Sequence, residues 1–334
     1  MLNDLIKSNE DIIENFNKNF ANIIEKEKDK TFNNIIEKIQ NKNFNFTDLM
    51  LINDCDNEEI NKLKREILNK TEFAQPAILL HSYLNYKKFI KEKFNNNEKS
   101  YINNKNLYFF GPSLGEIISL VCANSIDLNK AGSLLYKRGK FMQESCPLGK
   151  GAMLNVIGDI YKNINLFNKF IENNKNEEIN LSSIMSKRLL LLSGASDSIE
   201  KSKIFYKENS IACRKLVVSA AFHSNLMSDG SKKFKEYLFE ESENIFFGFP
   251  EVNIISTISP EFVYQRRDLN ELNEEEFNRK IKEMLVEQFT KKVDLMSCVE
   301  NYSKFIADSE ELQKDDYELY DIIKRKNVNI NDFL

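Results

Sequence analysis

Several residue types are scarce in this chain of 334 residues, and each scarcity excludes a class of protein. Tryptophan is absent, and 5 prolines and 10 glycines are too few for long flexible linkers. With only two histidines, a histidine-rich metal site is excluded, and we expect no metal and no other bound cofactor. The cysteines lack CxxC spacing, so they predict free thiols rather than a disulfide framework or a zinc site. They are Cys55, Cys122, Cys146, Cys213 and Cys298.

Charge and hydropathy exclude further partners. The 47 basic and 51 acidic residues are interspersed, so no basic face indicates a nucleic-acid partner. No apolar run approaches the roughly 20 residues that span a bilayer. The first residues, MLNDLIKSNEDIIENF, contain neither an apolar signal core nor an Arg-rich transit peptide, so a complete N-terminus would indicate the cytoplasm. We expect a monomer.

Apolar spacing predicts an α/β fold. A hydrophobic content of 42% supports a sizeable core, arranged as one large domain with an inserted subdomain or as two domains. Apolar residues three and four apart predict helices, and short apolar runs predict strands. The first 150 residues are expected to form a strand over 107–110 and helices over 1–40, 57–68, 69–94 and 129–145.

Residues 151–218 form a different block. The pattern predicts strands over 151–158, 188–194 and 213–222, with helices over 160–174 and 196–209 between them. This βαβαβ order fits a small subdomain inserted between 1–150 and 219–334, which form the larger body. The rest of the body is expected to contain a strand over 252–258 and helices over 270–289, 293–303 and 317–326.

The run GPSLG at 111–115 lies between a predicted strand and a predicted helix. This is the setting of a nucleophile elbow, in which flanking glycines allow close packing around a strained serine. The five-residue pattern alone is weak, and without this setting an ordinary turn is the commoner explanation. Ser113 is therefore a candidate nucleophile, and the Leu114 N–H, at the positive end of the helix, is a candidate oxyanion donor.

An activated serine needs a general base, and the chain offers His81 or His223. An isolated histidine is most often structural. His81 lies on an apolar helical stretch, whereas His223 directly follows a predicted strand, where a loop residue can face a site, so His223 is the better candidate. Arg138 is either a solvated helix charge or a guanidinium that binds a substrate carboxylate through two hydrogen bonds, and spacing does not decide between these.

Several stretches together carry a family resemblance. The chain resembles the malonyl-CoA:acyl-carrier-protein transacylases over about residues 50–305, with the motifs in the family's order. The stretches are NKTEFAQPAIL (69–79), GPSLGEIISLVCANSIDL (111–128), YKRGKFMQESCPLGKGAM (136–153), SAAFHSNLM (219–227) and a degenerate LVEQFTKKVDLMSCVE (285–300).

The resemblance implies an α/β-hydrolase-like acyltransferase body with a ferredoxin-like subdomain at 151–218. It also implies malonyl transfer to the phosphopantetheine thiol of acyl carrier protein, in fatty acid biosynthesis. Ser113 would attack malonyl-CoA with His223 as the base, and the carrier thiol would then take the malonyl group. Such systems in eukaryotes sit in plastids or mitochondria, so a plastid (apicoplast) or mitochondrial location is also implied.

The resemblance assigns four further site residues. Arg138 matches the arginine that holds the malonyl carboxylate, and Met142 is placed among the substrate-binding residues. Gln288 matches the residue whose backbone carbonyl orients the histidine. The Leu114 N–H would supply one half of the oxyanion hole.

The chain departs from the family pattern in four places. It lacks the first strand and the GQG loop that completes the oxyanion hole, and one such donor is worth about 10²–10³ in rate. Pro112 replaces a histidine, SSIMSKR (182–188) replaces a polar segment, and FIADSEELQKDDYELYDIIKRK (305–326) replaces a glycine motif. These departures fit either a truncated gene model of an active enzyme or a diverged, impaired homologue. The retention of Ser113, His223, Arg138 and Gln288 favours the first.

Two other functions fit parts of the sequence. A serine hydrolase or lipase is the nearest enzymatic alternative, because GxSxG does not separate transfer from hydrolysis. The patatin-type Ser–Asp dyad would need a DGG-like partner, for which Ser228-Asp229-Gly230 is a poor substitute. A non-catalytic module could instead bind an acidic carrier protein through basic side chains. Those side chains are Lys137, Lys140, Arg214 and Lys215.

Overall fold

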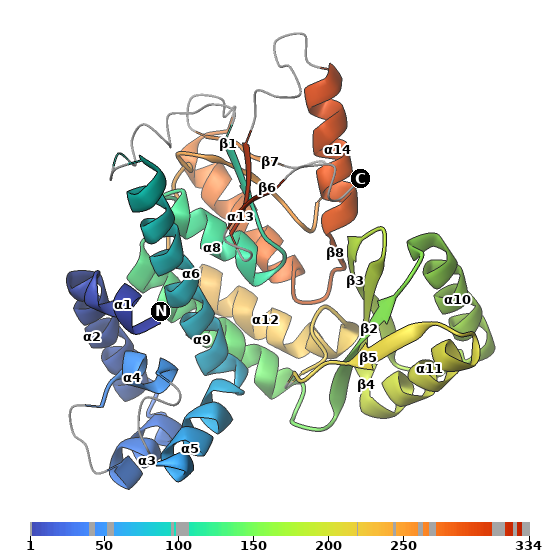
Figure 1. The fold of residues 1–334 in the computed structure, drawn as a ribbon, viewed down its shortest axis with the longest axis horizontal. Coiled ribbons are helices and arrows are strands. Elements are labelled where there is room, and N and C mark those ends of the chain that lie inside the picture. The colour runs from blue at the N-terminus through green and yellow to red at the C-terminus, as the bar shows by residue number, and fades with distance from the viewer. Residues whose placement is uncertain are drawn as a thin grey trace.

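The computed structural model describes most of the chain. The described residues are 2–39, 44–51, 57–94, 97, 107–218, 220–242, 245–259, 263–266, 272–308, 318–322 and 326–328. Cys55 lies outside them, and the other four cysteines are free, as the sequence predicts. Figure 1 shows a body of two parts with a smaller lobe beside it, formed by the segment from β2 to β5.

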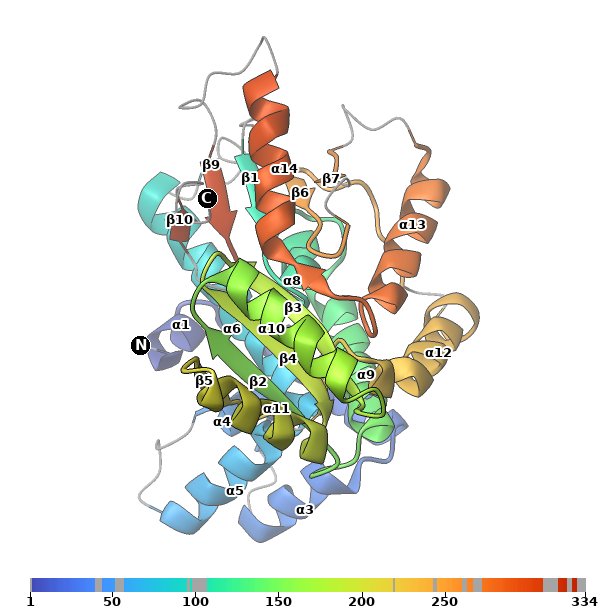
Figure 2. The ribbon, with the colours of Figure 1, turned by 90° about the vertical axis from the view of Figure 1, so that its right-hand side faces the viewer.

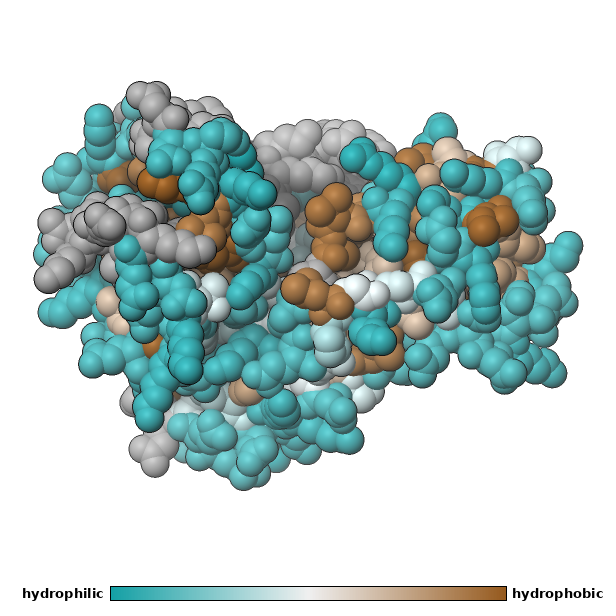
Figure 3. Space-filling view, turned by 90° about the horizontal axis from the view of Figure 1, so that it is seen from below, coloured by the Kyte–Doolittle hydropathy of each residue, from teal (hydrophilic) through white to brown (hydrophobic). Residues whose placement is uncertain are grey.

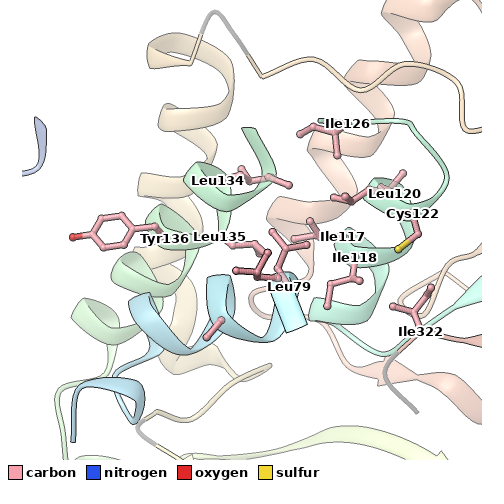
Figure 4. Close-up of a cluster of buried hydrophobic side chains, with 14 of the residues drawn as sticks. Leu79, Ile117, Ile118, Leu120, Cys122, Ile126, Leu134, Leu135, Tyr136 and Ile322 are labelled. Atoms are coloured by element: carbon pink, nitrogen blue, oxygen red, sulfur yellow. The ribbon is translucent and has the colours of Figure 1, made fainter. Parts of the chain in front are cut away.

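Helices fill the N-terminal third of the chain, as the apolar spacing predicts. They are α1 (Leu2–Lys7), α2 (Glu10–Lys26), α3 (Lys30–Ile39), α4 (Phe46–Met50), α5 (Glu58–Leu68) and α6 (Thr71–Phe94). The inward side chains of α2 include Phe16 and Phe20, each 1% exposed. The main core continues between α6, α8 (Leu114–Cys122) and α9 (Leu128–Ser145), whose apolar side chains meet in Figure 4.

The larger sheet is centred on β1 (Leu107–Phe110), the strand predicted before Ser113. Its order is β10-β9-β1-β6-β7, with β6 (Asn253–Ile255) and β9 (Glu318–Asp321) parallel to β1. The outer strands β7 (Val263–Tyr264) and β10 (Lys326–Val328) are antiparallel. All four residues of β1 are buried, because α8 covers one face of the strand and α14 (Leu295–Asp308) packs on the other.

The smaller sheet has the order β5-β2-β4-β3-β8. Its strands are β2 (Gly151–Ile157), β3 (Ile179–Ser186), β4 (Leu189–Ala195), β5 (Ala212–Lys215) and β8 (Val293–Asp294). Figure 2 shows α10 (Ile160–Asn173) and α11 (Ser196–Glu208) on one face of this sheet. Strands β2 to β5 with these helices run βαββαβ in the antiparallel order 4-1-3-2, which is the ferredoxin-like arrangement. Strand β8, from beyond residue 218, extends the sheet in parallel with β3.

Three sequence predictions of secondary structure are wrong. The helix expected over 317–326 is replaced by β9 and β10, because β9 is hydrogen-bonded on both sides within the larger sheet. The strand expected over 213–222 ends at Lys215, after which the chain returns to the body and buries Ala220 and Ala221 in the main core. Strand β3 has no counterpart in the predicted βαβαβ order, so the small lobe has one strand more than expected.

The surface seen from below is mostly hydrophilic, and its apolar side chains stand in small separate patches (Figure 3). Among the helices of the described residues, none combines the length and the apolar character needed to cross a membrane.

Candidate active site

The turn after β1 is a nucleophile elbow. Ser113 has φ 54° and ψ −104°, a conformation that costs an L-residue about 1–3 kcal/mol and that the surrounding structure must impose. A Cβ on Gly111 would lie 2.8 Å from the Cα of Gly115, so a side chain at position 111 would clash with the backbone of the turn. The Pro112 carbonyl accepts a hydrogen bond from the Gly115 N–H at 3.0 Å. Proline in this place is therefore compatible with the elbow, because only its carbonyl is used.

Arg138, on α9, reaches the nucleophile. The residue is 2% exposed, so it is not a solvated helix charge. Its Nη2 donates to Ser113 Oγ at 3.1 Å and to Gln288 Oε1 at 2.8 Å, and its Nη1 donates to Gln75 Oε1 at 2.7 Å. Burial lowers the pKa of Arg138 to about 9, and the nearby Glu116 carboxylate opposes this shift. The guanidinium is therefore charged at neutral pH.

His223 lies in the loop that follows the buried Ala221, with φ 57°. Its Nδ1 is 2.6 Å from the backbone carbonyl oxygen of Gln288. Since a carbonyl only accepts, this contact requires a proton on Nδ1 and leaves Nε2 with its lone pair in the neutral ring. Burial and the charge of Arg138 lower the pKa of His223 to about 4, against the opposing hydrogen bond to Gln288. A neutral imidazole that carries its proton on Nδ1 has the protonation state of a general base.

Gln288, at the end of α13 (Glu274–Glu287), connects these groups. Its carbonyl faces His223, its side-chain oxygen faces Arg138, and its Nε2 is 3.3 Å from the Ser113 carbonyl. Within the described residues, Ser113 Oγ is hydrogen-bonded to Arg138 and not to His223. The structure thus brings the four principal residues predicted from sequence into one network, in which His223 and Ser113 are both hydrogen-bonded to Gln288.

Two residues of this network were missed by sequence reasoning. Gln75 bonds Arg138 and also lies 3.5 Å, through Nε2, from the sulfur of Met142. Glu116 is fully buried beneath the elbow and accepts from Gln288 Nε2 at 3.1 Å. Both lie inside the motifs quoted above, TEFAQPAIL and GPSLGE. A polar residue between apolar neighbours on a helix was the available signal.

The two remaining predicted site residues are placed as follows. Met142 is 1% exposed on α9, and its sulfur contacts Gln75. Leu114 is the first residue of α8, and within the described part of the chain its N–H takes part in no hydrogen bond. This N–H stands at the positive end of the helix, next to Ser113. The roles of Met142 and Leu114 in substrate binding stay predictions.

Other sequence-based candidates lie away from the site or are occupied. Lys137 and Lys140 are paired with Glu27, the residue that follows α2, at 2.6 and 3.0 Å. Those two lysines are therefore engaged inside the body rather than offered to a partner. His81 is half-buried on α6. In the part of the chain that the structure describes, no cluster of three histidine, cysteine, aspartate or glutamate residues could hold a metal ion.

Fold and site together define an α/β architecture with a nucleophile elbow on a central parallel strand and a ferredoxin-like lobe beside it. A solved malonyl-transacylase, in complex with its type II PKS acyl-carrier protein, has this fold, with a TM-score of 0.61 and 24% identity. The likeness covers 91% of this chain and 82% of that one.

Sequence comparison finds curated relatives of the same kind as this solved structure. The chain is 30% identical over 194 residues to a malonyl CoA-acyl carrier protein transacylase of Haemophilus influenzae, which is 58% of each chain. It is 29% identical over 210 residues to that of Bacillus subtilis, covering 62% of this chain and 61% of the relative. The chain thus spans about three fifths of the length of these curated relatives. No protein-family model matches it. Over these stretches the chain is similar to malonyl CoA-acyl carrier protein transacylases.

Proposed function

We propose that this chain transfers the malonyl group of malonyl-CoA to the phosphopantetheine thiol of acyl carrier protein, for fatty acid biosynthesis. The observation that carries the proposal is the buried guanidinium of Arg138, 3.1 Å from Ser113 Oγ. A fixed cation beside the nucleophile suits an acyl group that ends in a carboxylate and does not suit a neutral acyl chain. This favours malonyl transfer over lipase-type hydrolysis.

The proposed reaction has two halves. Ser113 Oγ attacks the thioester carbonyl while His223 Nε2 takes the hydroxyl proton, and the imidazolium then protonates the departing coenzyme A sulfur. In the second half, His223 takes the proton of the carrier thiol, whose sulfur attacks the malonyl ester, and the proton returns to Ser113. Arg138 binds the malonyl carboxylate throughout, and Gln288 keeps the imidazole in the required tautomer.

The substrates imply the rest of the site. The Leu114 N–H would donate to the developing oxyanion, and Met142 would line the acyl position. We expect no bound cofactor beyond the two substrates, and the protein would act as a monomer. The body would consist of 1–150 and 219–334, with 151–218 as the inserted subdomain. The location would be a plastid or mitochondrion.

Intact mass spectrometry after incubation with malonyl-CoA tests the proposal. We expect one malonyl adduct on wild type, removed by phosphopantetheinylated carrier protein. The adduct should be absent from Ser113→Ala and retained in Ser119→Ala. Ser119 is buried on the same helix, and among the described residues its hydroxyl bonds only the Gly115 carbonyl. Wild-type protein that forms no adduct would refute the active-enzyme proposal and favour an impaired homologue.

A further inference from the structure

Glu116 is a buried carboxylate that the reaction steps above leave unused. It lies in the first turn of α8, three residues after Ser113, and its side chain is 0% exposed. The Tyr264 hydroxyl donates to Oε1 at 2.5 Å, and the Thr257 hydroxyl and N–H donate to Oε2 at 2.8 and 3.3 Å. Gln288 Nε2 is the fourth donor. Burial raises the pKa of Glu116, and these hydrogen bonds oppose the rise. These four hydrogen bonds satisfy the buried carboxylate and fix its position in the fold.

Glu116 fixes the orientation of the Gln288 side chain. A guanidinium only donates, so the amide atom that faces Arg138 must be the oxygen. The amide nitrogen must then face Glu116, which has to accept its hydrogen bond. The backbone carbonyl of the same glutamine holds the Nδ1 of His223. Glu116 therefore acts on both the cation and the base of the site through one intermediate residue.

Glu116 is also a counter-ion for Arg138, separated from it by the side-chain amide of Gln288. The side-chain acceptors of Arg138 are Gln75, Ser113 and Gln288, all uncharged, and within the described residues no carboxylate bonds the guanidinium directly. The Nε of Arg138 is buried and has no hydrogen-bond partner among the residues that the structure describes. A directly paired carboxylate would occupy the donors that an incoming substrate carboxylate needs. The intervening amide keeps the compensating charge close without blocking them.

We infer that Glu116 is a positioning residue for acyl transfer. It fixes the orientations of His223 and Arg138 through Gln288, and it balances the charge of the buried guanidinium without occupying its hydrogen-bond donors. The inference rests on the proposed function. Loss of its charge would loosen the base more than it weakens the attraction of Arg138 for the substrate. The maximal rate of Ser113 acylation should therefore fall, while the half-saturating malonyl-CoA concentration should change little.

Single-turnover malonylation, followed by quenched-flow intact mass spectrometry over a range of malonyl-CoA concentrations, tests the inference. Glu116→Gln keeps the shape and removes the charge, and Tyr264→Phe keeps the charge and removes one donor. Ser119→Ala is the matched control on the same helix and should react at the wild-type rate. We expect the maximal rate to fall about 10- to 100-fold in Glu116→Gln and about 3- to 10-fold in Tyr264→Phe. The half-saturating concentration should stay within about threefold, and the final adduct should remain stoichiometric.

The outcomes are distinguishable. A Glu116→Gln protein that acylates Ser113 at the wild-type rate overturns the inference. A Glu116→Gln protein with a wild-type rate but a smaller final amount of adduct also overturns it, because that result shows only that less of the protein is folded. If Glu116→Gln does not fold, an unchanged rate in Tyr264→Phe overturns it. If wild type forms no malonyl adduct, the proposed function fails. The labelling rate of Ser113 by a fluorophosphonate then tests Glu116 separately, with the same expected order of variants.

Discussion

Lowering the pH from 7 to 5 is expected to destabilise the folded protein through His223, and His223→Asn is expected to remove that part of the loss. The imidazole is 6% exposed, and burial together with Arg138 lowers its pKa from 6.5 to about 4. Below pH 6.5 the unfolded chain therefore binds a proton that the folded protein does not bind. A lowered pKa means that the full stability is present above pH 6.5 and is lost progressively as the pH falls toward 4.

The magnitude follows from the two pKa values. Each pH unit between them changes the free energy of unfolding by up to about 1.4 kcal/mol, so the loss between pH 7 and pH 5 is about 2 kcal/mol. Other titrating groups add their own contributions. These contributions are shared by wild type and variant, so the difference between the two proteins isolates the imidazole.

Urea denaturation at pH 7 and pH 5 measures this difference. Asparagine suits position 223 because it tolerates the positive φ of 57° better than most residues. His81→Asn removes the other histidine and is the matched control, which should lose as much stability as wild type. If the stability of His223→Asn shows the same pH dependence as that of wild type, the imidazole is not held neutral in the fold. That result would contradict the assignment of His223 as a neutral general base.

Three further predictions concern the helix contacts, the elbow and the cation. Gly139→Ala should destabilise the fold by about 1–3 kcal/mol, because the new Cβ would lie 2.4 Å from the Thr71 carbonyl oxygen. Gly149→Ala, with no atom within 4 Å but φ 83°, should cost about 1 kcal/mol, and thermal or urea unfolding compares the two. Ser113→Gly should be more stable than Ser113→Ala by about 1–2 kcal/mol, because glycine relieves the positive φ; equal stabilities would show that the elbow is unstrained. Arg138→Ala should lower malonyl-CoA acylation of the serine at least tenfold relative to acetyl-CoA acylation in competition, and an unchanged preference would contradict the carboxylate contact.

Local patterns were sufficient where an element is defined by its own residues. The strand Leu107–Phe110 was located to the residue, because four apolar side chains lie between a polar run and a glycine turn. Strand β3 was missed because its sequence INLSSIMS contains Ser182 and Ser183, which read as polar loop residues although both are buried. Strand β9 was missed because ELYD becomes a strand only by pairing with β1, which is remote in sequence.

In the site, too, some residues could be predicted from local sequence and others depended on tertiary contacts. Ser113 and His223 could be chosen from their settings and from the family resemblance. The state of Arg138 could not be decided, because the exposure of a helix face depends on the elements packed against it. Glu116 reads locally as an acidic residue in the first turn of a helix, where it complements the helix dipole. Its burial arises from Thr257 and Tyr264, which no local pattern links to it.

The pairing of β1 has a consequence for the order in which the chain can fold during synthesis. Tyr108 pairs with Asn253 on one side and with Leu319 on the other, so both neighbours of the nucleophile strand are made long after it. The ferredoxin-like strands, by contrast, find their partners between residues 151 and 215. The LYFF segment of β1 is therefore synthesised as an apolar strand with two open edges, whereas β2 to β5 of the small lobe can pair with one another before β6, β8 and β9 are made.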